Sequence, residues 1–227
     1  MVVSIILLLP PTSASSLNSI ELLSQWHLAP HLSLFMEKRL YAVYRKSDLM
    51  IATNFNYHSV DGTIPLTFEH KLVKLVVKLN ADNISSDELD NTTIEYGWNY
   101  DWDTYYPIAV DVAYTGLDAS KPDEEFSMTL TPKENTTEEV INLGKYNAEG
   151  NSAIVVPYEI PASRNFLTIT IGTRKYYCKS SQKVVFEEGK VTTVTVTLER
   201  DKVYMSNVNI TNWGTGTNND AQGTMYN

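Results

Sequence analysis

The residue types that most often carry out chemistry are few in this chain, and they are not arranged for catalysis. The four histidines are His27, His31, His58 and His70, all in the first 70 residues. His27 and His31 have the i, i+4 spacing of a helical metal pair, but Pro30 between them breaks such a helix. The single cysteine, Cys178, lies in an apolar run and has no histidine in its half of the chain, which is typical of a small buried hydrophobic residue.

Other catalytic signatures are missing from the sequence as well. It has neither a serine nucleophile elbow nor a glycine-rich phosphate loop. One cysteine excludes an internal disulfide framework and a multi-cysteine zinc site. We therefore expect a protein that is not an enzyme, with no catalytic residues, no metal and no cofactor.

One segment is chemically unusual. Between Tyr96 and Pro107, six aromatic residues are interleaved with Asp and Asn. Sugars bind such surfaces because flat rings stack on their C–H faces while carboxylates and amides accept their hydroxyls. The candidate ligand-binding residues for a glycan are Trp98, Tyr100, Asp101, Trp102, Asp103 and Tyr105. The alternative is a loop whose rings fold back to cover one end of the fold. A calcium loop built on Asp101 and Asp103 is disfavoured, because the segment lacks the regular oxygen spacing of such loops.

Composition limits the class of protein that could present this segment. The chain has 227 residues, 43% of them hydrophobic, which is enough for a substantial core. Its formal net charge of −9 repels phosphate backbones, so we expect no nucleic acid as partner. The 23 threonines, 18 asparagines and 14 tyrosines favour strands and polar turns over helices.

Alternation of apolar and polar residues with period 2 predicts short strands along most of the chain. In the run 71–79, Val73, Leu75 and Val77 share one face; helix spacing also fits, but the β-branched content favours a strand. Residues 172–174 and 187–190 are predicted hairpin connections. Further strands are predicted at 64–68, 108–114, 126–130, 153–156, 166–171, 175–178, 184–186, 191–198 and 203–210. About nine strands without a long helix predict an all-β protein, an antiparallel β-sandwich.

The two ends of the chain differ from this pattern. Residues 1–36 have Glu21 as their only charged side chain, and the apolar run Val2 to Leu9 is followed by two prolines. This atypical N-terminal segment indicates either a degenerate export signal or a misread start of the reading frame. Residues 214–227 are poor in apolar residues, which predicts a flexible tail.

Four features in order resemble the fimbrillin-like proteins of Bacteroides, which form or decorate surface pili. The first pairs Asp48-Leu49-Met50-Ile51-Ala52 with the run from Leu66 to Leu75, which is similar to the family's Leu-x-Phe-x-His-x-Leu-x-Lys strand. The others are Ala153 to Pro157, then Phe186 to Lys190, then Ile210 to Trp213. The resemblance covers about three quarters of the chain.

This resemblance implies two transthyretin-like β-sandwich domains in tandem. Residues 37–61 would be the remnant of the N-terminal fimbrillin domain, and residues 62–213 the C-terminal fimbrillin-like β-sandwich. Family members lose a first strand after cleavage at a basic residue, which opens a groove for a strand from a neighbouring subunit. Arg39 and Arg45 are basic residues of the right kind, but both lie too close to Asp48 for the sequence to assign either.

The expected function is that of a non-enzymatic structural or adhesive protein at the cell surface or outer membrane. Its expected partners are other pilus subunits, joined by strand exchange, together with host glycans or proteins. A partner strand satisfies exposed apolar surface and unpaired backbone groups at once, so no catalytic residue is required. The alternative is a monomeric carbohydrate-binding β-sandwich that uses the segment around Trp98 and Trp102.

Overall fold

Two four-stranded sheets form the body of the protein. The computed structural model describes residues 3–9, 48–54, 68–81, 84–115, 127–199 and 202–213. The first sheet has the order β11-β4-β16-β17, formed by Asn151–Val155, Val73–Asn80, Lys190–Glu199 and Lys202–Asn212. The second has the order β10-β5-β13-β14, formed by Ile141–Lys145, Thr92–Tyr96, Asn165–Ile171 and Arg174–Lys179. Neighbouring strands are antiparallel except for the parallel pair β4 and β16.

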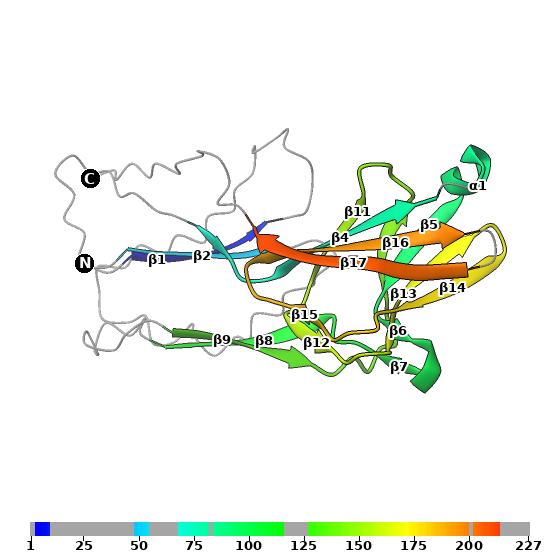
Figure 1. Ribbon diagram of the computed structural model, residues 1–227. Helices are drawn as coiled ribbons and strands as arrows, with labels where there is room; N and C mark the ends of the chain where they lie inside the picture. The colour runs from blue at the N-terminus through cyan, green and yellow to red at the C-terminus, as the bar shows by residue number, and fades with distance from the viewer. Residues whose placement is uncertain are drawn as a thin grey trace.

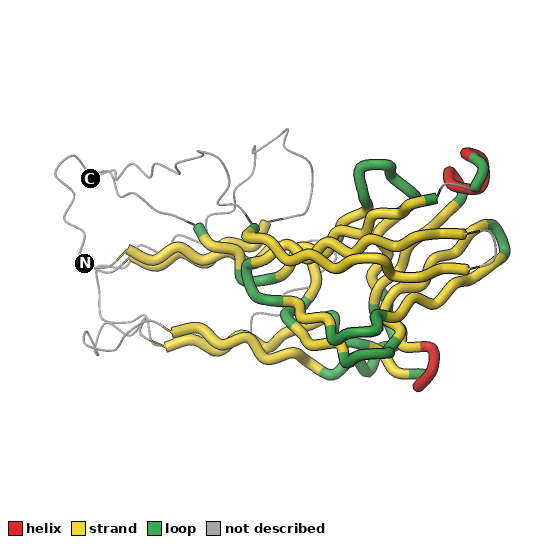
Figure 2. The backbone as a smooth tube through the Cα atoms, in the orientation of Figure 1, coloured by secondary structure: helices red, strands yellow, loops and turns green. Residues whose placement is uncertain are grey.

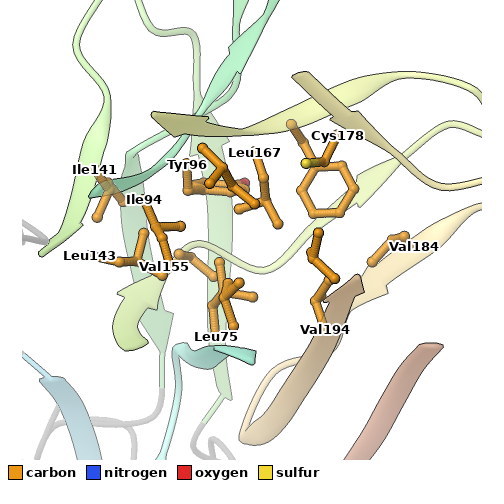
Figure 3. Close-up of a cluster of buried hydrophobic side chains, with 14 of the residues drawn as sticks. Leu75, Ile94, Tyr96, Ile141, Leu143, Val155, Leu167, Cys178, Val184 and Val194 are labelled. Atoms are coloured by element: carbon orange, nitrogen blue, oxygen red, sulfur yellow. The ribbon is translucent and has the colours of Figure 1, made fainter. Parts of the chain in front are cut away.

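The core lies between these sheets because alternate residues of each strand point inward. In β16, Val194, Val196 and Leu198 are buried, and the threonines between them are half-buried. Figure 3 shows inward side chains from both sheets meeting in one cluster, among them Val194, Leu75, Leu167 and Cys178. The largest fully buried side chains in it are Tyr96, Phe166 and Phe186. Cys178 is therefore a core residue, as predicted.

A buried asparagine helps to close one side of the sandwich, where β10 leads into β11. The side-chain amide of Asn151 donates to the carbonyls of Leu143 and Lys145 at 2.9 and 2.7 Å. Its oxygen accepts from the backbone N–H of Asn147 at 3.1 Å. One side chain thus satisfies polar groups at a turn that carries the chain from one sheet to the other.

A third sheet and a two-stranded ribbon extend from the sandwich toward the left of Figure 1. The sheet has the order β1-β2-β3, formed by Val3–Leu9, Asp48–Asn54 and Glu69–His70. The ribbon is β8 and β9, Ala109–Thr115 and Ser127–Lys133. A second buried cluster joins the two, because Leu49 of β2 and Val110 of β8 pack with Leu72 and Val156.

The remaining elements are short, and the tube in Figure 2 shows how little of the chain is helical. They are α1 (Ser86–Asp90), the ribbon β12 and β15 (Tyr158–Ile160, Val184–Phe186), and the hairpin β6 and β7 (Trp98–Asn99, Thr104–Tyr105) around a 3₁₀ turn (Tyr100–Trp102). The helix begins with a capping box between Ser85 and Glu88. No helix in the described ranges is long and apolar enough to cross a membrane.

The predicted all-β antiparallel sandwich is confirmed, and most of the run 71–79 lies in strand β4, Val73–Asn80. The hairpin at 172–174 is also confirmed, since β13 and β14 pair across it. The hairpin predicted at 187–190 is wrong, because β15 pairs with β12 whereas β16 pairs with β4 and β17. That turn is tight, with Lys190 N–H donating to Glu187 O, but it carries the chain between sheets.

Other predictions remain open. The transthyretin-like topology and the division at residues 36, 61 and 213 stay predictions. Residues 64–67 and 214–227 lie outside the described residues, as do His27, His31 and His58. Within the segment 1–36, residues 3–9 form β1, which pairs with β2 over its full length.

Candidate functional site

The aromatic segment forms the hairpin β6 and β7 at one end of the sandwich (Figure 1). Trp98 and Tyr105 are paired across the hairpin, and the 3₁₀ turn forms its tip. Asp103 closes the turn with φ of +47°, a left-handed conformation that aspartate tolerates better than most residues. Two backbone hydrogen bonds anchor the hairpin: Gly97 N–H to Phe166 O and Tyr106 N–H to Gly97 O.

The six aromatic rings divide into inner and outer groups. Tyr96 and Tyr106 are buried, and Trp98 and Tyr105 are half-buried. Trp98 is the centre of a ring cluster with centroids 5.5 Å from Tyr100, 6.3 Å from Tyr105 and 5.6 Å from Tyr177. Part of the segment therefore covers the end of the fold, as the alternative interpretation proposed.

The outer group consists of Tyr100 and Trp102, which are 51% and 61% exposed. One face of Tyr100 stacks on Tyr177 with centroids 4.1 Å apart and planes within 7°. The guanidinium of Arg164 lies 3.9 Å from the centre of the Trp102 ring. Each exposed ring is thus supported on one face by a neighbour.

The two aspartates of the turn are held by weak contacts. The carboxylate of Asp101 lies 3.7 Å from Lys179 Nζ, and Asp103 Oδ1 accepts from the indole N–H of Trp98 at 3.3 Å. Both aspartates are exposed. The predicted site residues are therefore brought together at the tip of one hairpin, and sequence reasoning missed Tyr177, Arg164 and Lys179, which come from other strands and loops.

Tyrosine hydroxyls near this end of the fold stay neutral. Burial, with smaller contributions from Tyr158 and other neighbours, raises the pKa of Tyr106 to about 12. Desolvation and the carboxylates of Glu138 and Asp103 raise the pKa of Tyr105. At neutral pH these phenols are therefore uncharged.

Among the residues that the structure describes, groups suited to catalysis do not gather at this end. Burial raises the pKa of the Cys178 thiol to about 12, so it is not a ready nucleophile. Among residues in the described ranges, no three His, Cys, Asp or Glu side chains lie close enough to hold a metal ion.

A second group of notable residues lies where β2 and β3 join the sandwich. Nδ1 of His70 is 2.6 Å from Oδ2 of Asp48, and the His70 ring stacks on Trp213 with centroids 3.8 Å apart and planes within 1°. Asp48 is buried, and its other oxygen, Oδ1, has no hydrogen-bond partner in the described structure. We name Asp48, His70 and Trp213 the junction triad.

Backbone hydrogen bonds and an ion pair also link the segments of chain around the junction triad. Trp213 N–H donates to Gly189 O at 3.2 Å, and Gly189 N–H donates to Leu72 O at 3.0 Å. Lys71 Nζ lies 3.0 Å from the carboxylate of Glu188. Segments that carry the resemblance to the fimbrillin-like family meet here: Asp48, His70, the turn 187–190 and Trp213 come from four separate stretches of chain.

A family model described as fimbrillin-like matches residues 38–213, and no curated protein matches. The chain is similar to a solved candidate cell adhesion protein from Bacteroides uniformis ATCC 8492, with 19% identity, a TM-score of 0.59, and coverage of 82% of this chain and 71% of that one.

Two further solved structures are more distant. A candidate cell adhesion protein from Bacteroides ovatus ATCC 8483 matches with 14% identity and a TM-score of 0.41, over 74% of this chain and 68% of that one. A fimbrial protein from Bacteroides vulgatus ATCC 8482 matches with 14% identity and a TM-score of 0.30, over 76% and 65%. Of these three likenesses, the one to the Bacteroides uniformis protein, with a TM-score of 0.59, shows a shared fold.

Proposed function

The chain belongs to the fimbrillin-like family, and from that premise we propose that it is a non-enzymatic cell-surface protein, a pilus subunit or pilus-associated adhesin that assembles by β-strand exchange. The observation that carries this proposal is the family match over residues 38–213, which includes β2, the junction triad and the whole sandwich. Its partners are other subunits, and its place is the outer surface of the cell.

The pairing of β1 with β2 supports strand exchange. All seven residues of β1 are in antiparallel register with β2, from Val3 opposite Asn54 to Leu9 opposite Asp48. In the described structure β1 is an edge strand, and β2 is its one neighbour in the sheet. An edge strand held by a single partner is the easiest strand of a sheet to replace.

The composition of β1 and the burial of β2 agree with this role. Six of the seven β1 residues are apolar. On β2, three successive residues, Leu49, Met50 and Ile51, are buried, so both faces of that strand are covered. Loss of β1 would leave backbone N–H and C=O groups of β2 unpaired in an apolar setting. An incoming strand of similar composition would pair with these groups and cover the apolar surface.

The connection between β1 and β2 is long enough to be cut without touching either strand. Residues 10–47 join them and contain four basic residues: Lys38, Arg39, Arg45 and Lys46. Cleavage after any of them breaks the covalent link between β1 and the rest of the chain. The closeness of Arg39 and Arg45 to Asp48 is therefore no obstacle, because the exchanged strand is on the far side of the cut.

Mild trypsin treatment of the purified full chain tests this proposal. Light scattering and negative-stain electron microscopy should show a monomer before cleavage and a ladder of oligomers or filaments after it. A variant with Lys38, Arg39, Arg45 and Lys46 all changed to Gln is the control, since its connection resists trypsin and it should stay monomeric.

An engineered disulfide between β1 and β2, which can be reduced again, gives a second control. Ser4 and Thr53 are opposite each other in the β1–β2 register, so Ser4→Cys with Thr53→Cys should form a disulfide that retains β1 after cleavage. Buried Cys178 should not compete for this bond. We expect the oxidised, cleaved variant to remain monomeric and to assemble on reduction; a cleaved wild-type chain that stays monomeric would contradict strand exchange.

A further inference from the structure

The tip of the β6–β7 hairpin presents two aromatic rings to solvent in a way that the packing of the fold does not require. Trp102 and Tyr100 are 61% and 51% exposed, although large apolar side chains are usually consumed by burial. Each ring is nevertheless fixed in place: Tyr177 stacks on Tyr100, and the Arg164 guanidinium lies over Trp102. An exposed ring with one supported face offers its other face at little cost in conformational entropy.

We propose that this tip binds neutral oligosaccharides, with Trp102 and Tyr100 as stacking platforms. Stacking of pyranose C–H groups on an indole or phenol face is driven by dispersion and by the negative charge of the ring face, and it needs rigid, exposed rings. The proposal goes beyond assembly, since it concerns a surface separate in sequence from β1 and β2.

The polar groups beside the rings suit hydroxyls. Asp101 and Asp103 flank Trp102 in sequence, and each carboxylate has about four acceptor positions, of which the contacts with Lys179 and Trp98 use only part. Sugar hydroxyls can donate to the remaining positions.

The charge of the site favours a ligand without net charge. The carboxylates of Asp101 and Asp103 have two cations nearby, Lys179 and Arg164, while Glu138 adds a further negative charge near Tyr105. The chain as a whole carries a net charge of −9, which opposes anionic ligands. A neutral glycan is the class that meets no electrostatic penalty at this surface.

The backbone of the tip predicts the size of the ligand. Tyr100 and Trp102 are two positions apart on a 3₁₀ turn with about three residues per turn, so their side chains leave the turn in directions about 120° apart. One sugar ring cannot lie on both aromatic faces. Each ring forms its own subsite, and an oligosaccharide that bends around the tip should bind better than a monosaccharide.

A printed array of neutral and sialylated glycans, probed with the labelled, uncleaved full chain, tests this inference. We expect binding to neutral oligosaccharides, weakened about fivefold to tenfold by Trp102→Ala or by Tyr100→Ala and more by both together. Trp102→Tyr should retain most of the binding because it keeps an aromatic face. Both rings are exposed, so the variants should stay folded, and Tyr100→Ala should unfold at a slightly lower temperature because it loses the stack on Tyr177.

Tyr204→Ala is the matched control, because Tyr204 is 45% exposed but lies on β17, outside this site. It should bind as the wild type does. The inference is overturned if no neutral glycan binds, if sialylated glycans bind preferentially, or if the Trp102→Ala, Tyr100→Ala double variant binds like the wild type. Because the array uses uncleaved chain and the assembly test uses cleaved chain, either proposal can fail while the other stands.

Discussion

The contact between His70 and Trp213 should be an energetic coupling that holds the β1-β2-β3 sheet to the sandwich. Their rings lie 3.8 Å apart and are parallel within 1°. Stacked aromatic pairs contribute about 0.5–1.5 kcal/mol beyond the area that they bury. We expect a coupling free energy in that range between His70→Ala and Trp213→Leu.

The single variants should be unequal. Trp213 is half-buried, so Trp213→Leu should lower the free energy of unfolding by about 1–2 kcal/mol. His70→Ala should lower it by about 2–4 kcal/mol, because it also removes the 2.6 Å hydrogen bond to Asp48. Asp48 is buried and its Oδ1 has no partner in the described structure, so without His70 that carboxylate would lose the hydrogen bond at Oδ2 as well and carry the full desolvation cost.

Urea denaturation of the wild type, the two single variants and the double variant, followed by far-ultraviolet circular dichroism, measures the coupling. A second cycle pairs His70→Ala with Tyr204→Ala as control, since Tyr204 lies near the opposite end of β17 from Trp213. The control pair should be additive within about 0.5 kcal/mol. Additivity of the His70 and Trp213 pair as well would refute the reasoning that the triad couples the sheet to the sandwich.

Three further predictions concern backbone fit, thiol accessibility and a buried hydroxyl. Gly189→Ala should destabilise the fold more than Gly172→Ala: both have positive φ, but an added Cβ at Gly189 would lie 3.0 Å from His70 O, and at Gly172 it would meet nothing within 4 Å. Urea midpoints measure this difference, and equal midpoints would contradict it. Burial raises the pKa of Cys178 to about 12, so iodoacetamide at pH 8 should label this thiol only after the protein unfolds. Between pH 9 and 12 the folded thiol keeps its proton, whereas the unfolded thiol loses it. Cys178 should therefore lower the free energy of unfolding as the pH rises from 9 toward 12. Tyr96→Phe should leave stability unchanged or raise it by about 1 kcal/mol, because the buried Tyr96 hydroxyl has no hydrogen-bond partner in the described structure; a loss measured by urea denaturation would show that it has one.

Period-2 alternation is enough to predict the sandwich, because the central strands β4, β5 and β16 bury mainly one face, although β13 is buried on both. It found β4 and β16 with their inward residues, yet it passed over β5, where Thr92, Ile94 and Tyr96 are buried and alternate with half-buried neighbours. That signal was present, but a threonine at an inward position makes the pattern look polar. The strand β10 is harder to find, since its run is short and a register shift between Asn142 and Gly144 interrupts the pairing.

The candidate sites show where local pattern stops being informative. The aromatic segment was visible in the sequence because its residues are contiguous. Its supports, Tyr177 and Arg164, were not, because only the tertiary fold brings them to the hairpin. The same holds for the junction triad: Asp48, His70 and Trp213 belong to separate motifs, and no spacing rule shows that they touch.

The measurement that tests the account most directly is the mass of the chain before and after the β1–β2 connection is cut. Strand exchange predicts a monomer that becomes oligomers or filaments on cleavage, with the Ser4→Cys, Thr53→Cys disulfide preventing assembly until it is reduced. A cleaved chain that remains monomeric, or oligomers that form equally well with β1 locked in place, would contradict it.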